Sequence, residues 1–322
     1  MHYYNDGADG FVWEPLYRKR SGLTPCEQEI VMHPALRRLQ RIAHYGGSAR
    51  ILPMTHTRFT HTIGVFTLAV HFCPEDWLLR LAALLHDVGH LPFSHSAERG
   101  LGADHHELTV RVLEESGLNA ILRKHGFDPA AVLAVIEGRP PNPLVCGADR
   151  LSLDHLDSWL RDTETCAMGQ IPAHQLLDGL RLNGPYVEAI DERTAREVVR
   201  RVAADHRLFL KPRCLAMDTL VTEIFAQAHP AVDPLLKMGD EEALTLAAER
   251  VPHLVELLRD RPWAVEIRPD DGGPGLLVTV RKLYTGQILL NGRPVAEAMP
   301  EAAAVYEALE RLKQSYRVTL RV

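Results

Sequence analysis

A histidine and an aspartate stand side by side in the segment LAALLHDVGHLPFSH, residues 81–95. An imidazole and a carboxylate in adjacent positions can bind one divalent cation together. His86 and Asp87 close an apolar stretch of helical periodicity. Gly89 and Pro92 then break the helix, so that the following loop can fold back over the pair. The segment therefore predicts a bound metal ion that activates a water molecule.

Two other segments offer ligands that could complete such a site. His61 opens the apolar-striped stretch TRFTHTIGVFTLAVHF. Asp154 lies in LSLDHLDSWLRD, where four charged residues fall on or near one face of a leucine-rich helix. Asp149 is the alternative to Asp154 as the fourth metal ligand, because it also precedes a basic residue and an apolar helix. At that position it is better explained as a helix cap or first-turn acid. The histidines without such a context, which we expect to be surface or packing residues, are His56, His71 and His174.

The chemistry that this site suits is hydrolysis of a phosphate ester. That reaction needs an activated water, neutralised charge on the phosphate and a proton for the departing oxygen. His95 and His106 are candidate proton donors, and Glu98 is placed three residues after His95 to orient its ring. Arg58, one turn before His61, is a candidate clamp for a phosphate oxygen through its planar guanidinium. A surface salt bridge is the alternative role for Arg58.

Helices must position most of these residues. Apolar residues recur at helical spacing up to about residue 230, and Gly or Pro separates the stretches. Pro34 opens the first, ALRRLQRIAHYGG, which Gly46 and Gly47 end. This part of the chain is predicted to be an all-α bundle. The further helices predicted within it are 60–72, 76–87, 104–117, 129–137, 149–161, 173–182, 191–205 and 215–228.

The pattern changes towards the C-terminus. From about Trp263, runs such as AVEIRP, LLVTVRKLY and QILLNGRPV are bounded by Gly-rich turns and predict short strands. A helix around 298–313 and a final alternating stretch, SYRVTLRV, follow. Residues 230–262 are predicted to be a mostly helical linker. The sequence thus predicts a helical domain at 1–230 and a second part at 231–322, made of the linker and a small α+β unit.

Composition limits the classes of protein to consider. A chain of 322 residues with 46% hydrophobic content can bury one large core and a smaller unit. The formal charge of −6 implies no global attraction to nucleic acid. Five scattered cysteines without a CxxC pair indicate reduced thiols. The N-terminus shows no signal sequence, and no apolar run approaches the ~20 residues of a bilayer span. We expect a soluble cytoplasmic protein that does not bind a membrane.

The array RFTHTIGV, LLHDVGHLPFSH and LDHLDSWLRD resembles the HD-domain metal-dependent phosphohydrolases, and within them the deoxynucleoside triphosphate triphosphohydrolase branch. RRLQRIAHYGG, HHE at 105–107 and KLYTGQILLNGRPV resemble further segments of that branch. The resemblance covers most of the chain and is densest over 35–170. It implies a mainly α fold, an HD-domain helical bundle with a small C-terminal α+β unit, and a homo-oligomer. The metal ligands that it implies are His61, His86, Asp87 and Asp154.

The same resemblance assigns roles in catalysis. His95 would be the general acid, and His90 and His106 would bind phosphate. In such enzymes, attack at the α-phosphorus of a deoxynucleoside triphosphate releases the nucleoside and intact triphosphate. One divalent ion is implied, and mixed histidine and carboxylate ligation suits Mn, Mg, Fe, Co, Ni or Zn.

The sequence departs from that pattern where substrate is bound. His155 follows the aspartate ligand, where the branch usually has Lys or Arg, so a phosphate contact is altered. Ser158 replaces a usual Tyr. His44 and Tyr45 stand where a glutamine and a leucine read the sugar, which predicts a changed sugar or base pocket. Asp162 keeps its place and would hydrogen-bond a sugar hydroxyl.

The predicted function is metal-dependent hydrolysis of a nucleotide, with a deoxynucleoside triphosphate as the favoured substrate. A nucleotide monophosphatase or phosphodiesterase on the same site is the enzymatic alternative. A nucleotide-sensing regulatory module with a vestigial site is an alternative of another class. The array argues against the sensing module, because binding alone gives no reason to retain a proton donor beside a complete metal set.

Overall fold

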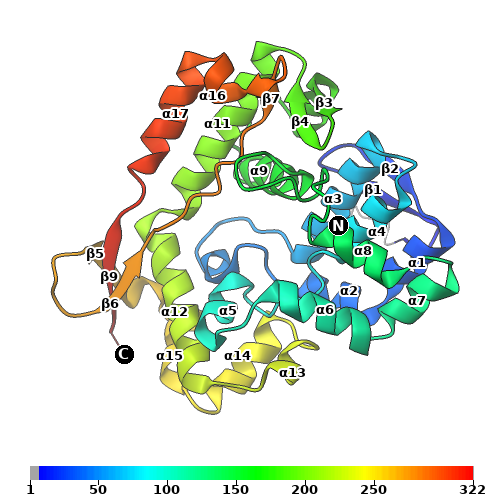
Figure 1. Cartoon of the computed structure of the whole chain (residues 1–322). Helices are drawn as coiled ribbons and strands as arrows, with labels where there is room; N and C mark the ends of the chain where they lie inside the picture. The colour runs from blue at the N-terminus through cyan, green and yellow to red at the C-terminus, as the bar shows by residue number, and fades with distance from the viewer. Residues whose placement is uncertain (1–6, 322) are drawn as a thin grey trace.

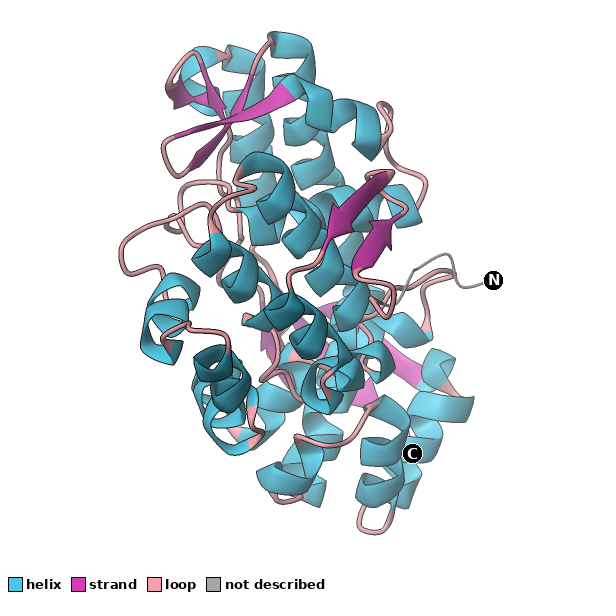
Figure 2. Ribbon diagram, turned by 90° about the vertical axis from the view of Figure 1, so that its right-hand side faces the viewer, coloured by secondary structure: helices cyan, strands magenta, loops and turns pink. Residues whose placement is uncertain are grey.

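The computed structural model describes residues 7–321 of the chain. Helices make up most of the molecule, and short strands gather at its periphery (Figures 1 and 2), so the predicted mainly α fold is confirmed. The α-helices are α1 (Pro25–Met32), α2 (Pro34–Arg37), α3 (Arg58–Phe72), α4 (Trp77–Leu85), α5 (His95–Leu101), α6 (His105–Glu115), α7 (Leu118–Lys124), α8 (Pro129–Ile136), α9 (Leu153–Thr165), α10 (Ala173–Leu176), α11 (Glu192–Phe209), α12 (Pro212–Ala228), α13 (Val232–Leu235), α14 (Asp240–Ala248), α15 (Pro252–Asp260), α16 (Val295–Ala298) and α17 (Pro300–Glu310).

The strands of the described residues form three small sheets. One is an antiparallel hairpin of β1 and β2, the second has the order β3-β4-β7-β8, and the third has the order β5-β9-β6. In the second sheet β4 and β7 pair in parallel, so a strand from the last part of the chain joins a hairpin from its middle. The strands are β1 (Phe11–Glu14), β2 (Lys19–Gly22), β3 (Leu180–Asn183), β4 (Tyr186–Ala189), β5 (Val265–Pro269), β6 (Leu276–Thr279), β7 (Leu289–Leu290), β8 (Arg293–Pro294) and β9 (Ser315–Leu320).

Helix α3 is the central element of the site. Its residues are almost all buried, as expected for a helix that is apolar over most of its surface. It packs against α4 on one side and α9 on another, and these helices belong to one hydrophobic cluster. A second cluster surrounds α12, which packs against α5, α14 and α15. Both clusters contain residues from either side of position 230, and the domain boundary proposed there stays a prediction.

Helix ends fix the positions of the metal-site residues. Thr57 caps α3 by accepting the Thr60 N–H, which places His61 one turn inside the helix. Helix α4 ends at Leu85, and His86 is its C-cap, so the His-Asp pair stands at the point where the chain turns away. Ser152 caps α9 by accepting the His155 N–H. Each cap satisfies backbone groups that would otherwise lack a partner.

The predicted helix from Pro34 to Gly46 is wrong beyond residue 41. Helix α2 passes into a 3₁₀ helix, η1 (Arg38–Arg41), and the chain is extended at Ile42. The Ile42 carbonyl accepts the Arg58 N–H at 2.9 Å, and the His44 N–H donates to the His56 carbonyl at 3.0 Å. This pairing with the segment before α3 replaces the helical hydrogen bonds, and a second 3₁₀ helix, η2, covers Gly46–Arg50.

Two other helix predictions need correction at their ends. Helix α9 begins at Leu153, so Asp149 is neither a cap nor a first-turn acid. The predicted helix 173–182 stops earlier, because a 3₁₀ helix, η3, ends at Gly179 and β3 follows. Gly184 and Pro185 form the two-residue turn from β3 to β4, and Gly184 supplies the positive φ that the first position of such a turn can require.

The C-terminal predictions agree with the structure. Residues 230–262 are mostly helical, in α13, α14 and α15, and the predicted strands and helix of the α+β unit are present. A last 3₁₀ helix, η4, covers Pro262–Ala264. Among residues 7–321, no helix is both long enough and apolar enough to cross a bilayer.

Candidate metal centre and active site

The four predicted metal ligands converge from three helices. The Nε2 atom of His61 lies 3.0 Å from Oδ1 of Asp154 and 3.9 Å from Oδ2 of Asp87. The Nε2 atom of His86 lies 3.5 Å from Oδ1 of Asp87 and 3.9 Å from Oδ1 of Asp154. Ligand atoms bound to one ion at about 2.1 Å are separated by about 3–3.5 Å. One donor atom each of His61, His86 and Asp87 can be chosen so that all lie within 4.8 Å of one another, and Asp154 adds an oxygen beside both histidines, so the spacing approaches that of a coordination shell.

His86 directs the lone pair of one ring nitrogen towards this centre. Its Nδ1 lies 2.9 Å from the Ala83 carbonyl, and a carbonyl only accepts, so Nδ1 carries the proton. In the neutral ring Nε2 is then unprotonated. That atom is buried and has no hydrogen-bond partner among the described residues. A buried polar atom without a partner is costly, and a metal ion would satisfy it.

His61 is oriented in the same way by a carboxylate. Its Nδ1 donates to Oδ2 of Asp157 at 2.9 Å, which leaves Nε2 facing the carboxylates of Asp87 and Asp154. Burial disfavours the charged ring, but hydrogen bonds to Asp154 and Asp157 outweigh it and raise the pKa of His61 to about 9. Without a metal ion, a proton on Nε2 supplies the positive charge that the two carboxylates require.

Asp157 is held in turn by a buried network. Its carboxylate accepts hydrogen bonds from Tyr17 at 2.7 Å and from two guanidinium nitrogens of Arg161, at 2.8 and 2.9 Å. Burial raises the pKa of Asp157, but Arg161 and His61 outweigh this and hold the pKa below its usual range. The network fits against α3 at Gly64, where any Cβ would overlap the Asp157 and Arg161 side chains. Glycine is therefore required for this approach of α9 to α3.

Arg58 lies inside the site and is not a surface salt bridge. Its Nη1 donates to Oδ2 of Asp87 at 3.0 Å, and its Nε donates to the Ser94 hydroxyl at 2.9 Å. The side chain is buried. Burial raises the pKa of Asp87, but the nearby His86, His90 and Arg58 outweigh it and hold the pKa well below its usual range. Asp87 is therefore anionic, as a metal ligand of this type has to be.

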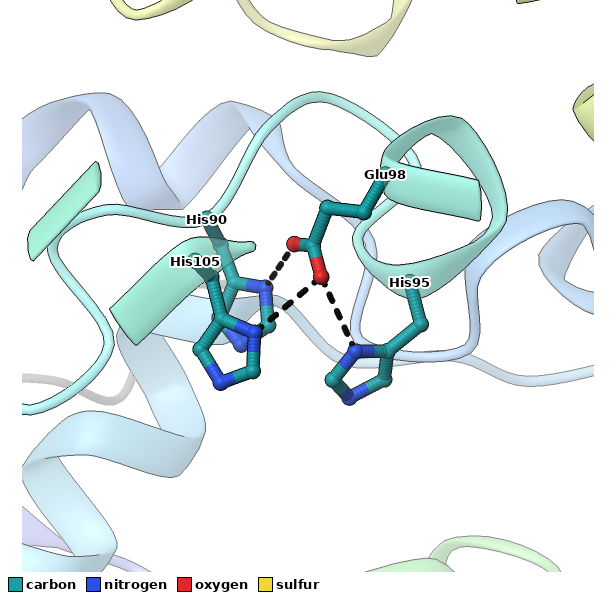
Figure 3. A group of neighbouring side chains, drawn as sticks. All are labelled: His90, His95, Glu98 and His105. Atoms are coloured by element: carbon teal, nitrogen blue, oxygen red, sulfur yellow. Dashed lines mark hydrogen bonds and ion pairs between the residues drawn. The ribbon is translucent and has the colours of Figure 1, made fainter. Parts of the chain in front are cut away.

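A second cluster is built around Glu98 on α5. Three imidazoles point their Nδ1 atoms at this carboxylate (Figure 3): His90 at 2.7 Å, and His95 and His105 at 3.1 Å each. Burial raises the pKa of Glu98, but the hydrogen bonds from these three rings outweigh it and hold the pKa far below its usual range. The predicted orientation of the His95 ring by Glu98 is present, although His95 begins α5 and does not lie in a loop.

His90 joins the two clusters. Its Nε2 lies 3.2 Å from Oδ1 of Asp87, while its Nδ1 faces Glu98. Burial is the main reason that the pKa of His90 is lowered to about 4. His95 is 55% exposed at its side chain, so the chain of contacts from the metal centre ends at a residue open to solvent.

His105 is a site residue that the sequence reasoning missed. Its ring stacks on that of His90, with centroids 4.1 Å apart, and its Nδ1 lies 3.1 Å from Oε2 of Glu98, while the neighbouring His106 is exposed. Both histidines belong to the HHE motif at the start of α6. Adjacent helical residues point about 100° apart, and the motif alone did not decide which one faces the site. The phosphate-binding role of His106 stays a prediction.

His44, Tyr45 and Asp162, which the resemblance assigned to the sugar, line a third buried group. His56 also belongs to it and is not a surface residue: its ring stacks on that of His44 with centroids 4.7 Å apart, and its Nε2 lies 3.5 Å from Oδ1 of Asp162. The Tyr45 ring packs edge-on against His56. Burial, with help from the neighbouring carboxyl of Asp205, raises the pKa of Asp162 well above its usual range. Burial also raises the pKa of Asp205 to about 7.

Two further candidates lie away from these clusters. The His155 ring lies near those of Trp159 and Tyr284, with centroids 5.7 and 5.6 Å away. Its Nδ1 forms a hydrogen bond with the Ser152 hydroxyl. Asp149 is exposed and pairs with Arg150. The structure thus brings Asp154, and not Asp149, into the metal centre.

The donor set fits a divalent transition ion. Two neutral imidazoles and two carboxylates are ligands that Mn, Fe, Co, Ni and Zn accept. A cation between these side chains would bind the lone pair of His86 Nε2, which has no hydrogen-bond partner among the described residues. It would also neutralise the carboxylates of Asp87 and Asp154 opposite His61. The second contacts of the ligands, to Ala83 and Asp157, are those that orient metal-binding histidines in general.

Comparisons with known proteins agree with this geometry. Residues 58–154 match the family model of the HD domain. Deoxynucleoside triphosphate triphosphohydrolase SAMHD1 of Danio rerio is 30% identical over 171 residues, which are 45% of this chain and 26% of that protein. A deoxyguanosinetriphosphate triphosphohydrolase-like protein of Brucella anthropi is 27% identical over 216 residues, 56% of this chain and 52% of that protein. The metal-dependent phosphohydrolase cns2 of Cordyceps militaris is 29% identical over 164 residues, 47% and 44% of the two chains.

The chain spans about half or less of the curated relatives that it matches. A likeness over nearly the full length comes from the crystal structure of a phosphohydrolase from Bacteroides thetaiotaomicron, with a TM-score of 0.74 over 97% of this chain and 100% of that chain. Because the two sequences are 17% identical, this likeness shows the fold alone. The segment that matches the HD domain begins at Arg58, ends at Asp154 and contains all four converging residues, so the likeness to HD-domain proteins covers the site itself.

Proposed function

We propose that the chain hydrolyses a nucleotide at this centre, with His61, His86, Asp87 and Asp154 as ligands of one divalent ion. The convergence of two imidazoles and two carboxylates carries the proposal. Such an ion would acidify a water molecule and offset negative charge on a phosphate. Everything else that the reaction requires comes from side chains around the ligands.

Arg58 is proposed to bind a phosphate oxygen. It already neutralises part of the charge on Asp87, it is buried, and its position is fixed by Ser94. A guanidinium held in this way binds an anionic oxygen without losing side-chain freedom on binding. His90, whose ring lies between Asp87 and Glu98, is proposed to bind phosphate as well, by exchanging its contact with Asp87 for one with substrate.

His95 is proposed to protonate the departing oxygen. Glu98 accepts from its Nδ1, so the opposite nitrogen, Nε2, is the one that can present a proton to substrate. The exposure of His95 allows the ring to take a new proton from solvent after each turnover. General acid catalysis of this kind contributes about 10²–10⁴-fold.

A deoxynucleoside triphosphate is the favoured substrate, with nucleoside and triphosphate as products. The names of two of the relatives support this choice, although they cover about half of the chain. Release of intact triphosphate requires that the α-phosphorus, and not the γ-phosphorus, lie at the metal centre. We also expect the chain to form a homo-oligomer. Light scattering coupled to gel filtration would measure its mass in solution.

The experiment is to incubate the protein with each of the four deoxynucleoside triphosphates and Mn²⁺ or Mg²⁺, and to separate the products by anion exchange. Nucleoside and triphosphate in equal amounts are expected from at least one substrate. Orthophosphate release, or cleavage of a cyclic dinucleotide, would instead identify a monophosphatase or phosphodiesterase. Binding without turnover of any of these substrates would favour the sensing module.

A further inference from the structure

A group of buried polar atoms beside the metal centre has no hydrogen-bond partner among residues 7–321. They are Nδ1 of His44, both ring nitrogens of His56, and the Oδ1 atoms of Asp162 and Asp205. Each buried polar atom left unpaired costs about 1–3 kcal/mol, and most proteins leave few of them. Five such atoms in one place indicate a built site that a ligand completes.

The geometry of the group suits a cation. One ligand atom each from His44, His56 and Asp162 can be chosen so that all lie within 4.8 Å of one another. The rings of His44 and His56 are stacked at an interplanar angle of 26°, and Nε2 of His56 lies 3.5 Å from Oδ1 of Asp162. Imidazole nitrogen and carboxylate oxygen are the usual ligands of divalent transition ions.

We propose that His44, His56 and Asp162 form a second divalent metal site, with Asp205 as a further oxygen donor. In a neutral imidazole one nitrogen keeps its proton and the other offers a lone pair, so His44 and His56 each supply one nitrogen ligand. A cation bound by these two nitrogens and by the carboxylate oxygen of Asp162 accepts one electron pair from each residue. His56 carries the argument, because its side chain is 7% exposed and neither nitrogen has a hydrogen-bond partner in the described part of the chain.

The second site is separate from the first. Asp154 and Asp162 are eight positions apart on α9, which corresponds to about 12 Å along the helix axis. No residue is shared between the two proposed ligand sets. The His44 ring nevertheless lies 4.6 Å, centroid to centroid, from that of His61. The two ions would therefore be neighbours. Because they share no ligand, removing one ion should leave the other bound.

Metal stoichiometry tests the proposal. The wild-type chain is freed of metal with a chelator, checked for retained helicity, and titrated with Co²⁺, whose visible absorption reports nitrogen and oxygen ligation. Bound metal is counted by plasma mass spectrometry after gel filtration. We expect about two ions per chain in the wild type. Uptake of a single ion by the wild type would overturn the second site.

Variants assign the two ions to the two sites. His56→Gln, which keeps a neutral polar side chain, should lower the count from about two to about one. His86→Gln should remove the other ion and leave the His56-dependent one in place. His253→Gln, on the exposed face of α15, is the matched control and should change nothing. A His56→Gln variant that still binds two ions, even if its KM rises because a sugar contact is lost, would contradict the proposal.

These results separate this inference from the proposed function. A chain that binds the His56-dependent ion and hydrolyses no nucleotide would keep the second site and remove the proposed activity. A chain that hydrolyses nucleotides at the His86 centre and takes up no His56-dependent ion would do the reverse.

Discussion

The Nδ1 atom of His61 lies 2.9 Å from a carboxylate oxygen of Asp157, and both side chains are completely buried. A carboxylate only accepts, so this contact fixes the proton on Nδ1 and leaves Nε2 facing Asp87 and Asp154. The contact therefore gives a buried histidine the orientation that the proposed metal ligand needs. Without Asp157, the ring is free to rotate or to carry its proton on the other nitrogen.

Replacing Asp157 by Asn should weaken metal binding about 10–100-fold, as loss of a contact that orients a ligand usually does. An amide accepts the Nδ1 proton less strongly, and it also leaves Arg161 with less negative charge to pair with. Competitive chelator titration measures the affinity. Tyr17→Phe is the matched control, because it removes another hydrogen bond to Asp157 without touching His61. Equal affinities of the two variants would refute the orienting role of Asp157.

Gly64→Ala should destabilise the chain and disturb the metal centre. In an open helix this change stabilises by about 1 kcal/mol, because glycine is a poor helix former. Here the new methyl group would overlap the side chains of Asp157 and Arg161, and overpacking costs about 1–3 kcal/mol. Urea unfolding measures the change. Gly22→Ala, whose Cβ would meet no neighbour within 4 Å, should stay within about 0.5 kcal/mol of the wild type.

His95→Gln should lower kcat by about 10²–10⁴-fold and leave the metal content unchanged. Glu98→Gln should have a smaller effect in the same direction, since it weakens the orientation of the His95 ring, and of His90 and His105, but leaves the proton donor in place. The deficit of His95→Gln should shrink with a nitrophenyl phosphodiester, whose leaving group needs no proton. A loss of equal size on both kinds of substrate would rule out His95 as the general acid.

Asp240 should make the stability depend on pH. Its carboxyl accepts the N–H groups of Ala43 and Phe93, at 2.9 and 2.8 Å, next to the site. Burial raises the pKa of Asp240 to about 6, against the opposing effect of these hydrogen bonds. Because the folded state favours the protonated form, this contribution to stability is complete below about pH 4 and is lost as the pH rises through about 6.

The comparison with Asp240→Asn isolates this effect, because the amide does not titrate. The unfolding free energy of the wild type, relative to that of the variant, should fall by up to about 3 kcal/mol between pH 4 and pH 7. Urea unfolding at the two pH values measures it. A relative stability that is constant or that rises over this range would show that the carboxyl is not held in its neutral form.

The convergence of the four proposed ligands was predictable because helical spacing and caps determine where these side chains point. His86 and Asp87 follow an apolar helix that ends in a turn, and Asp154 shares a charged face with the network that holds His61. The mainly α fold followed from the same periodicity.

The rest depended on tertiary contacts that periodicity does not contain. The segment after residue 41 has a helical pattern, but it pairs with the chain before α3, and this pairing buries His44 against His56. His56 precedes its helix, so no helical face marked it as a site residue. The choice of His105 over His106 depends on the docking of α6 against α5 through Glu98.

Anomalous scattering from a crystal grown with Mn²⁺ tests the central claim most directly. The account predicts a peak at the Mn absorption edge about 2.0–2.3 Å from Nε2 of His61, Nε2 of His86 and one carboxylate oxygen each of Asp87 and Asp154. A crystal saturated with Mn²⁺ that shows no peak between these four side chains would contradict it.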